Sequence, residues 1–223
     1  MTATYVILMG MQGAGKGTQA EVLTAQSGLP HVTSGGMFRA IMKQDSPLGK
    51  QIASIYNAGN LIPDDLTIQM IGARLREPDA LHGVILDGFP RTVPQAETLD
   101  KLLADMGTRV TVVPVFTISE DEALRRLGGR LVCTVNDQHL YQLEVNPPKV
   151  VGHCDIDGAP LYTRKDDTPD AIKQRIASFK SETGPVIDYY RAKGLVREIN
   201  AVQPIESVTA DLIAAVEAAK AGN

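Results

Sequence analysis

A glycine-rich segment near the N-terminus has the residues needed to bind a phosphate chain. It reads Gly10-Met11-Gln12-Gly13-Ala14-Gly15-Lys16-Gly17-Thr18, after a short apolar run and before a helical pattern. Glycines let several backbone N–H groups converge on one anion, and a helix N-terminus adds a favourable dipole. Lys16 would supply a mobile charge for β- and γ-phosphates. The alternative is a glycine-rich turn that binds nothing and contains a lysine by chance. The hydroxyl that usually follows the lysine comes one residue later, at Thr18.

Short apolar runs predict the strands that must position this loop. They are Tyr5–Met9, Val84–Leu86, Val110–Ile118 and Leu195–Ile199. Helical patterns lie between them, at Lys16–Gln26, Asp64–Arg76, Pro94–Met106, Glu120–Leu127, Pro169–Ala192 and Ile205–Ala219. Alternation of strands and helices predicts an α/β fold with a doubly wound parallel sheet. Pro114 predicts an irregularity or a sheet edge in the third run.

Two segments break the alternation and are predicted as inserts on a single domain of 223 residues. The first insert, residues 34–62, is helical and polar. The second insert, residues 129–167, is rich in Gly, Pro, Asn and Asp, holds both cysteines, and is predicted to form a small β-rich lobe. The core would then consist of residues 1–33, 63–128 and 168–223.

The composition excludes several classes of protein. Lys plus Arg is 22 and Asp plus Glu is 26, so the net charge of −4 disfavours sequence-independent nucleic-acid binding. No apolar run approaches the roughly 18 residues of a membrane span, and the N-terminus lacks the features of a secretory signal. Two cysteines make no disulfide framework. We therefore expect a cytoplasmic protein that binds neither nucleic acid nor membrane.

Six segments, in order, resemble the motifs of adenylate kinases and their nucleoside monophosphate kinase relatives. They are Gly15–Gln19, Gly59–Asp64, Asp87–Thr92, the set Arg126, Gly129 and Arg130, Thr163–Asp167, and Arg175. With the phosphate loop they span Gly10 to Arg175, so the resemblance covers nearly the whole chain. It implies a P-loop NTPase-type sheet, a monophosphate-binding role for the first insert, and the role of a long-form lid for the second.

The resemblance also implies an activity. It is the reversible transfer of the terminal phosphoryl group of Mg-ATP to AMP, giving two ADP, by direct in-line transfer. The implied partners are ATP, AMP and ADP, the cofactor is Mg²⁺, and the chain is expected to be a monomer. One alternative is a kinase for UMP, CMP or GMP. Another is a nucleotide-binding regulatory protein without turnover, which the retained Lys16, Asp87 and arginines disfavour.

Site residues follow from the same resemblance. The implied catalytic groups are Lys16, Arg91, Arg130, Arg164 and Arg175. The implied ATP site is Gly13, Ala14, Gly15, Lys16, Gly17, Thr18, Arg126, Arg130 and Gln203. The implied AMP site is Ser34, Arg39, Asn60, Leu61, Ile62, Gly88, Arg91, Gln95, Arg164 and Arg175. Asp87 would hold magnesium through water. Gln95 would read the adenine edge, because an amide donates and accepts at once.

The chain departs from the family pattern at three positions. Gly36 stands where an Asp beside the magnesium site is usual, so one outer carboxylate is missing. Leu131 replaces a common second Arg after Arg130, and Gln203 lies where a Lys is frequent. These departures bear on metal handling and rate rather than on the type of reaction.

The second insert also predicts a metal site. Cys133, His139, Cys154 and Asp157 offer the donors S, N, S and O, which suit tetrahedral zinc, with cobalt or iron(II) left open. Asn136 is a poor ligand, whereas His139 matches a Cys-x5-His pattern of rarer family members. His153 is the competing ligand. A metal-free polar network around two buried thiols is the alternative, and a disulfide is disfavoured in a reducing compartment.

Overall fold

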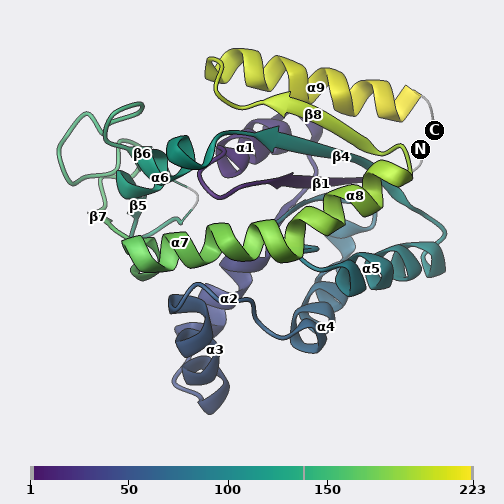
Figure 1. The fold of residues 1–223 in the computed structure, drawn as a ribbon, viewed down its shortest axis with the longest axis horizontal. Coiled ribbons are helices and arrows are strands. Elements are labelled where there is room, and N and C mark those ends of the chain that lie inside the picture. Colours follow the sequence, from purple (N-terminus) through teal and green to yellow (C-terminus); the bar gives the residue numbers. More distant parts are fainter. Residues whose placement is uncertain (1–2, 138, 222–223) are drawn as a thin grey trace.

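The computed structural model describes residues 3–137 and 139–221 and is built around a parallel sheet (Figure 1). The sheet has the order β2-β3-β1-β4-β8, and every neighbouring pair is parallel. Its strands are β1 (Thr4–Gly10), β2 (His31–Thr33), β3 (Gly83–Asp87), β4 (Val110–Thr117) and β8 (Val196–Asn200). The predicted doubly wound α/β sheet is confirmed. Since β3 and β4 flank β1 on opposite sides, the carboxyl end of β1 is a topological switch point, where such sheets bind ligands.

Helices cover both faces of the sheet. They are α1 (Lys16–Ser27), α4 (Asp64–Arg74), α5 (Val93–Asp105), α6 (Glu120–Gly128), α7 (Pro169–Ser178), α8 (Gly184–Ala192) and α9 (Ile205–Ala221). Alternate residues of β1 point to opposite faces: Tyr5 and Ile7 pack in the cluster with α4, α5 and α8, and Val6 and Leu8 pack with α1 and α9. Burial on both faces explains why the strands read as continuous apolar runs.

Two points about the sheet differ from the sequence analysis. Pro114 does not mark an edge, because β4 lies between β1 and β8. The irregularity is instead at Thr111, where the register against β1 shifts and Thr111 Oγ1 accepts the Tyr5 N–H at 3.0 Å. Strand β2 was not predicted, since three residues are too few to show a pattern. It forms one edge of the sheet beside β3.

The long helix predicted over Pro169–Ala192 is interrupted. A π-helical turn, Phe179–Thr183, separates α7 from α8. Pro185 is the cause, because it lies in the first turn of α8 and has no backbone N–H to donate to the preceding turn. The bend carries α8 onto the sheet while α7 runs toward the second insert (Figure 1).

Each insert has a small core of its own. The first insert contains α2 (Ser34–Met42) and α3 (Pro47–Asn57), packed around Phe38, Ile52 and Ile62. The second insert contains β5 (Arg130–Cys133), β6 (Leu140–Gln142) and β7 (Leu161–Tyr162), an antiparallel sheet in the order β6-β5-β7. The remaining helical turns are 3₁₀, at Pro78–Ala80 and Lys165–Asp167. None of the helices in the described residues is long and apolar enough to cross a bilayer.

Candidate active site

A cleft of about 720 Å³ opens at the carboxyl ends of β1 and β3. The glycine-rich loop forms its floor, and residues of both inserts complete its walls. All residues expected to bind ATP, the five expected catalytic cations and Asp87 line this one cleft. A volume of this size suits a ligand as large as a nucleotide, for which about 300–1,000 Å³ is typical.

The loop has the backbone shape that an anion site requires. Gly15 has φ +84° and caps the N-terminus of α1 in the left-handed conformation, which a side chain would strain. Lys16 Nζ donates to the carbonyls of Gly10 (2.8 Å) and Met11 (3.1 Å), so its ammonium lies over the loop. Burial lowers the pKa of Lys16 to about 8, the nearby arginines add to this, and Asp87 opposes it.

Arg130 and Arg175 are held by Asp167, the last residue of the motif segment Thr163–Asp167, to which the sequence analysis gave no role. The Asp167 side chain is fully buried, and its two oxygens accept from Arg130 Nε (2.8 Å) and Arg175 Nη1 (3.0 Å). Asp167 directly precedes the α7 cap residue Thr168, so the return of the chain to the core positions both guanidinium groups. Asp167 therefore fixes the positions of both guanidinium groups at the cleft.

Arg164 lies in a crowded cationic environment. Burial lowers its pKa to about 10, and the charges of Arg130 and Arg39 add to the effect. Its Nε is a buried donor without a hydrogen-bond partner in the described part of the chain. Arg91 is also buried, with its pKa lowered first by burial and then by Arg175. Closely spaced buried cations destabilise one another, so this arrangement favours a multiply charged anion between them.

Asp87 faces the cleft from the end of β3. Burial alone would raise its pKa, but the interaction with the His31 side chain and the charges of Lys16 and Arg91 outweigh burial and hold the pKa below the ordinary value. His31 Nε2 is buried without a hydrogen-bond partner and lies 3.8 Å from Asp87 Oδ2, too far for a direct hydrogen bond. An ionised carboxylate beside Thr18 and the loop fits a magnesium ion that keeps its water ligands.

A second, smaller pocket of about 40 Å³ adjoins the cleft, and Arg91, Arg175, Gly88 and Tyr56 line both. It collects the rest of the expected AMP site apart from Arg39 and Arg164, namely Ser34, Asn60, Leu61, Ile62 and Gln95. Gly88 is required here, because it has φ +76° and a Cβ would lie 2.8 Å from Ser34 Oγ. The Ser34 hydroxyl donates to Gly88 O at 2.6 Å. The hydroxyl kept at position 34 thus joins the first insert to the β3 loop.

The part of the cleft expected to bind ATP contains the predicted Arg126 and Gln203 and also apolar residues that the sequence analysis did not name. Arg126 Nη2 donates to Ala201 O (3.0 Å), which ties α6 to the loop before α9. Gln203 lines the cleft, although its side chain donates to Asp211. Apolar side chains also line this side, and they come from the second insert and from α9: Leu140, Val145, Ile205 and Val208. They offer an apolar surface for a flat base.

Two departures from the family pattern have structural correlates. The Gly36 N–H donates to Thr33 Oγ1 at 2.9 Å, and a Cβ at position 36 would lie 2.4 Å from that hydroxyl. An aspartate at this position would therefore require Thr33 to move. Leu131 packs against the small core of the second insert instead of extending a charge into the cleft.

The metal ligands predicted from the second insert come together. Donor atoms of Cys133, His139, Cys154 and Asp157 all lie within 4.8 Å of one another. Cys133 Sγ lies 3.4 Å from Asp157 Oδ1, and His139 Nδ1 lies 3.0 Å from Asp157 Oδ2 and 3.3 Å from Cys154 Sγ. Ligand atoms around tetrahedral zinc lie about 3.3–3.8 Å apart, given bonds of about 2.0–2.3 Å. The donor set and its spacing fit such an ion.

The competing ligand lies outside this group. His153 is exposed, and its Nδ1 lies 3.2 Å from Val151 O. His139 Nδ1, by contrast, lies within the group, 3.0 Å from Asp157 Oδ2 and 3.3 Å from Cys154 Sγ. Between the two histidines, the geometry favours His139.

Comparison with known proteins gives a consistent result. A family profile described as adenylate kinase matches residues 8–195. The adenylate kinase of Streptomyces avermitilis is 44% identical over 92% of this chain and 93% of its own length. Those of Streptomyces griseus and Lysinibacillus sphaericus are each 43% identical, over 97% and 96% of this chain and 99% of their own lengths. The similarity thus extends over both inserts as well as the core.

Proposed function

Since this chain belongs to the adenylate kinase family, we propose which of its residues carry out the reversible transfer of the terminal phosphoryl group of Mg-ATP to AMP, giving two ADP. One observation carries the assignment. Buried arginines that repel one another surround the junction between the large cleft and the small pocket. Phosphoryl transfer needs such charge where two phosphates meet, and little covalent chemistry from the protein.

The donor nucleotide occupies the cleft. Backbone N–H groups of the loop from Gly13 to Thr18 hold its phosphates, and Lys16 turns from the Gly10 and Met11 carbonyls to the β- and γ-phosphates. Asp87 holds magnesium through water, and the ion neutralises charge on the same phosphates. Arg126 and the backbone at Gln203 border the base.

The acceptor AMP lies across the small pocket and the adjoining part of the cleft, because the small pocket alone, at about 40 Å³, is smaller than a nucleotide. Arg39 and Arg91 grip its phosphate, and Ser34, Asn60, Leu61, Ile62 and Gly88 form the wall around it. Gln95 reads the edge of the base, and its side chain is already fixed in orientation. The pocket thereby selects AMP over pyrimidine monophosphates, which speaks against the UMP and CMP alternatives.

Three arginines stabilise the transferred phosphoryl group in the transition state: Arg130, Arg164 and Arg175. Arg is suited to this, since its planar fork binds phosphate oxygens in pairs and stays charged. The first insert acts as the monophosphate-binding unit and the second as the lid, and together they exclude water that would otherwise hydrolyse ATP. Residues 1–33, 63–128 and 168–223 form the core on which both move.

Zinc bound by Cys133, His139, Cys154 and Asp157 has a structural role in the second insert. Among the described residues of this lobe, the buried core is small and consists of Cys133, Tyr141 and Cys154 with a few partly buried neighbours. A lobe this small gains folding free energy from a metal. We further propose that the protein is a cytoplasmic monomer, since residues of this one chain already supply all the proposed catalytic groups of the cleft.

The test is ADP formation from Mg-ATP with AMP, CMP, UMP or GMP offered separately. We expect fast turnover with AMP and at least about 100-fold less with the others, the scale at which a polar site rejects a mismatched base. Preference for another acceptor would replace AMP as the substrate. No turnover with any acceptor, in folded protein, would support the regulatory alternative.

A further inference from the structure

We propose that Asp64, which the reaction itself does not use, determines the choice of purine at the acceptor site by fixing the direction in which the Gln95 amide faces. The inference rests on the proposed function, because it concerns the base of the acceptor monophosphate. Asp64 is the first residue of α4, and Gln95 lies in the first turn of α5.

Gln95 is held from two sides by groups of opposite kind. Its Oε1 accepts the backbone N–H of Arg91 at 2.7 Å, and its Nε2 donates to Asp64 Oδ1 at 2.6 Å. A backbone N–H can only donate, and an ionised carboxylate can only accept. The two partners therefore define which end of the amide is oxygen and which is nitrogen. The residue is 2% exposed, so water does not replace either partner.

Thr92 holds the Asp64 carboxylate in place. Its hydroxyl donates to Asp64 Oδ2 at 2.7 Å and accepts the Gln95 N–H at 3.3 Å as the cap of α5. The contacts form a closed ring from the Gln95 backbone through Thr92 and Asp64 to the Gln95 side chain. Rotating the Gln95 amide would break this ring at Asp64 and would also lose the contact with the Arg91 N–H.

The amide retains one N–H and one oxygen lone pair after these contacts. Adenine offers an acceptor at N1 and a donor at its 6-amino group, so the remaining pair matches its edge. A 6-oxopurine offers the opposite pattern, a donor at N1 and an acceptor at O6. To match it the amide must turn over, which would set N–H against the Arg91 N–H and oxygen against the Asp64 carboxylate. Binding of a 6-oxopurine would therefore leave buried polar groups unpaired, which weakens its binding relative to adenine.

The experiment compares AMP with IMP, which differs from it at the two relevant positions of the ring, in wild type, Asp64→Asn and Asp65→Asn. Asparagine at position 64 can donate to a turned Gln95 oxygen. We expect Asp64→Asn to lower the ratio of kcat/KM for AMP to that for IMP about tenfold, the scale of one hydrogen bond to a charged group. Asp65 is exposed in the same helical turn, so Asp65→Asn is the matched control and should leave the ratio unchanged.

A structural role alone would reduce both substrates equally and leave the ratio intact, which would overturn the proposal. Thr92→Val and Thr92→Ser provide a second pair of variants. Thr92→Val should lower the AMP-to-IMP ratio of kcat/KM, whereas Thr92→Ser, which keeps the hydroxyl, should have the ratio of the wild type. Calorimetric titration of each variant with AMP and with IMP separates binding from turnover. If wild type forms no ADP from AMP, the proposed function fails instead. If wild type is active and the ratio does not change in folded Asp64→Asn, only this inference fails.

Discussion

Arg39 of the first insert is joined to Asp137 of the second insert. Arg39 Nε and Nη2 lie 2.9 and 2.6 Å from the same oxygen, Asp137 Oδ2, and Nη1 donates to Tyr56 at 2.6 Å. The guanidinium proposed to grip the AMP phosphate is thus bound to a carboxylate of the chain itself. AMP and Asp137 compete for one cation.

Asp137→Asn should tighten AMP binding. The amide keeps the shape of the side chain but lacks the charge that holds Arg39, so the phosphate of AMP displaces a weaker partner. We expect the dissociation constant of AMP to fall about threefold to tenfold, the range for a partly buried charge pair. Calorimetric titration with AMP alone measures it.

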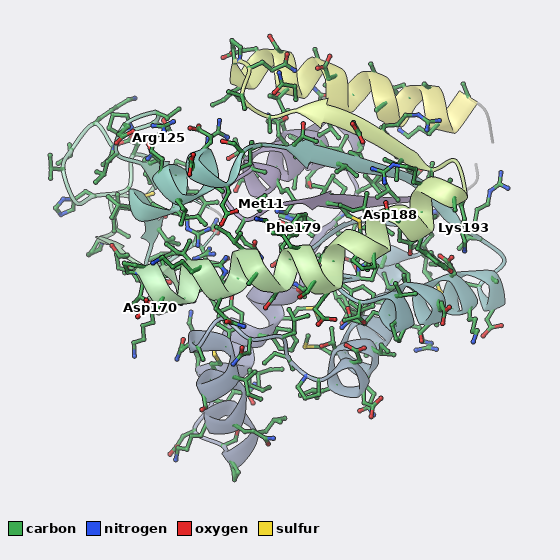
Figure 2. The ribbon with its side chains drawn as sticks, viewed as in Figure 1. Met11, Arg125, Asp170, Phe179, Asp188 and Lys193 are labelled. Carbon is green, nitrogen blue, oxygen red and sulfur yellow. The ribbon has the colours of Figure 1, made fainter. Side chains whose placement is uncertain are left out.

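Asp170→Asn is the control for that change, because Asp170 is an exposed carboxylate at the start of α7, as Figure 2 shows. It should leave AMP affinity unchanged. Weaker AMP binding in Asp137→Asn would show that Asp137 supports the bound state instead of competing with it.

Lys16→Ala and Arg91→Ala should each lower turnover by at least about 100-fold, the scale of losing one preorganised charge at the transferred group. Steady-state rates with saturating Mg-ATP and AMP measure the effect. Lys101→Ala, an exposed lysine on α5, is the control and should keep full activity. A loss below tenfold in Lys16→Ala or Arg91→Ala would remove that residue from the catalytic group.

ATP affinity should fall at alkaline pH. Burial lowers the pKa of Lys16 to about 8 in the free protein, so the ammonium loses its proton as the pH rises through 8. Bound phosphates favour the charged form, and the dissociation constant of Mg-ATP should therefore rise about tenfold between pH 7 and pH 9. Calorimetry without AMP measures it. Lys16→Arg, whose guanidinium stays charged over this range, should show a flat profile. A slope that persists in Lys16→Arg would assign the titration to another group.

The purified protein should contain about one zinc per chain by elemental analysis. His139→Ala should lose the metal, whereas His153→Ala should retain it, since only His139 lies with the cysteines. Removal of the metal should lower the melting temperature by at least about 4 °C. For a chain of this size, the melting temperature falls by about 2–4 °C for each kcal/mol lost from the free energy of unfolding. Zinc retained in His139→Ala and lost in His153→Ala would reverse the choice of ligand.

Sequence reasoning succeeded where the signal is local. The phosphate loop, its strand and its helix are contiguous, and burial on both faces makes the core strands continuous apolar runs. It failed where structure depends on partners remote in sequence. Strand β2 is only three residues long and exists because β3 pairs with it. Of the two readings of Pro114, the sheet edge was wrong, because nothing local shows that β4 has neighbours on both sides. The irregularity does occur in this run, at Thr111.

The same distinction holds for the site. The cations were found because they stand in short motifs, and they line one cleft. The carboxylates that hold them were given no role, although Asp64 and Asp167 end two of the motif segments. Asp167 meets Arg130 at 37 positions' separation, and Asp137 meets Arg39 at 98. Asp64 meets Gln95 across 31 positions. Such pairs follow from the folded arrangement of α4, α5 and the two inserts, and no spacing rule indicates them.

The charge distribution of the cleft has a consequence for how fast substrates arrive. Of the described residues that line it, eight are Lys or Arg and three are Asp or Glu, in a chain whose net charge is −4. A cationic hollow in an otherwise anionic surface focuses the field and raises the encounter rate with anionic ligands about 10- to 1,000-fold. Capture of nucleotides should therefore slow steeply as ionic strength rises. Polyanions too large to enter the hollow meet the repelling exterior, so the protein collects small phosphates from a mixture that also contains nucleic acid.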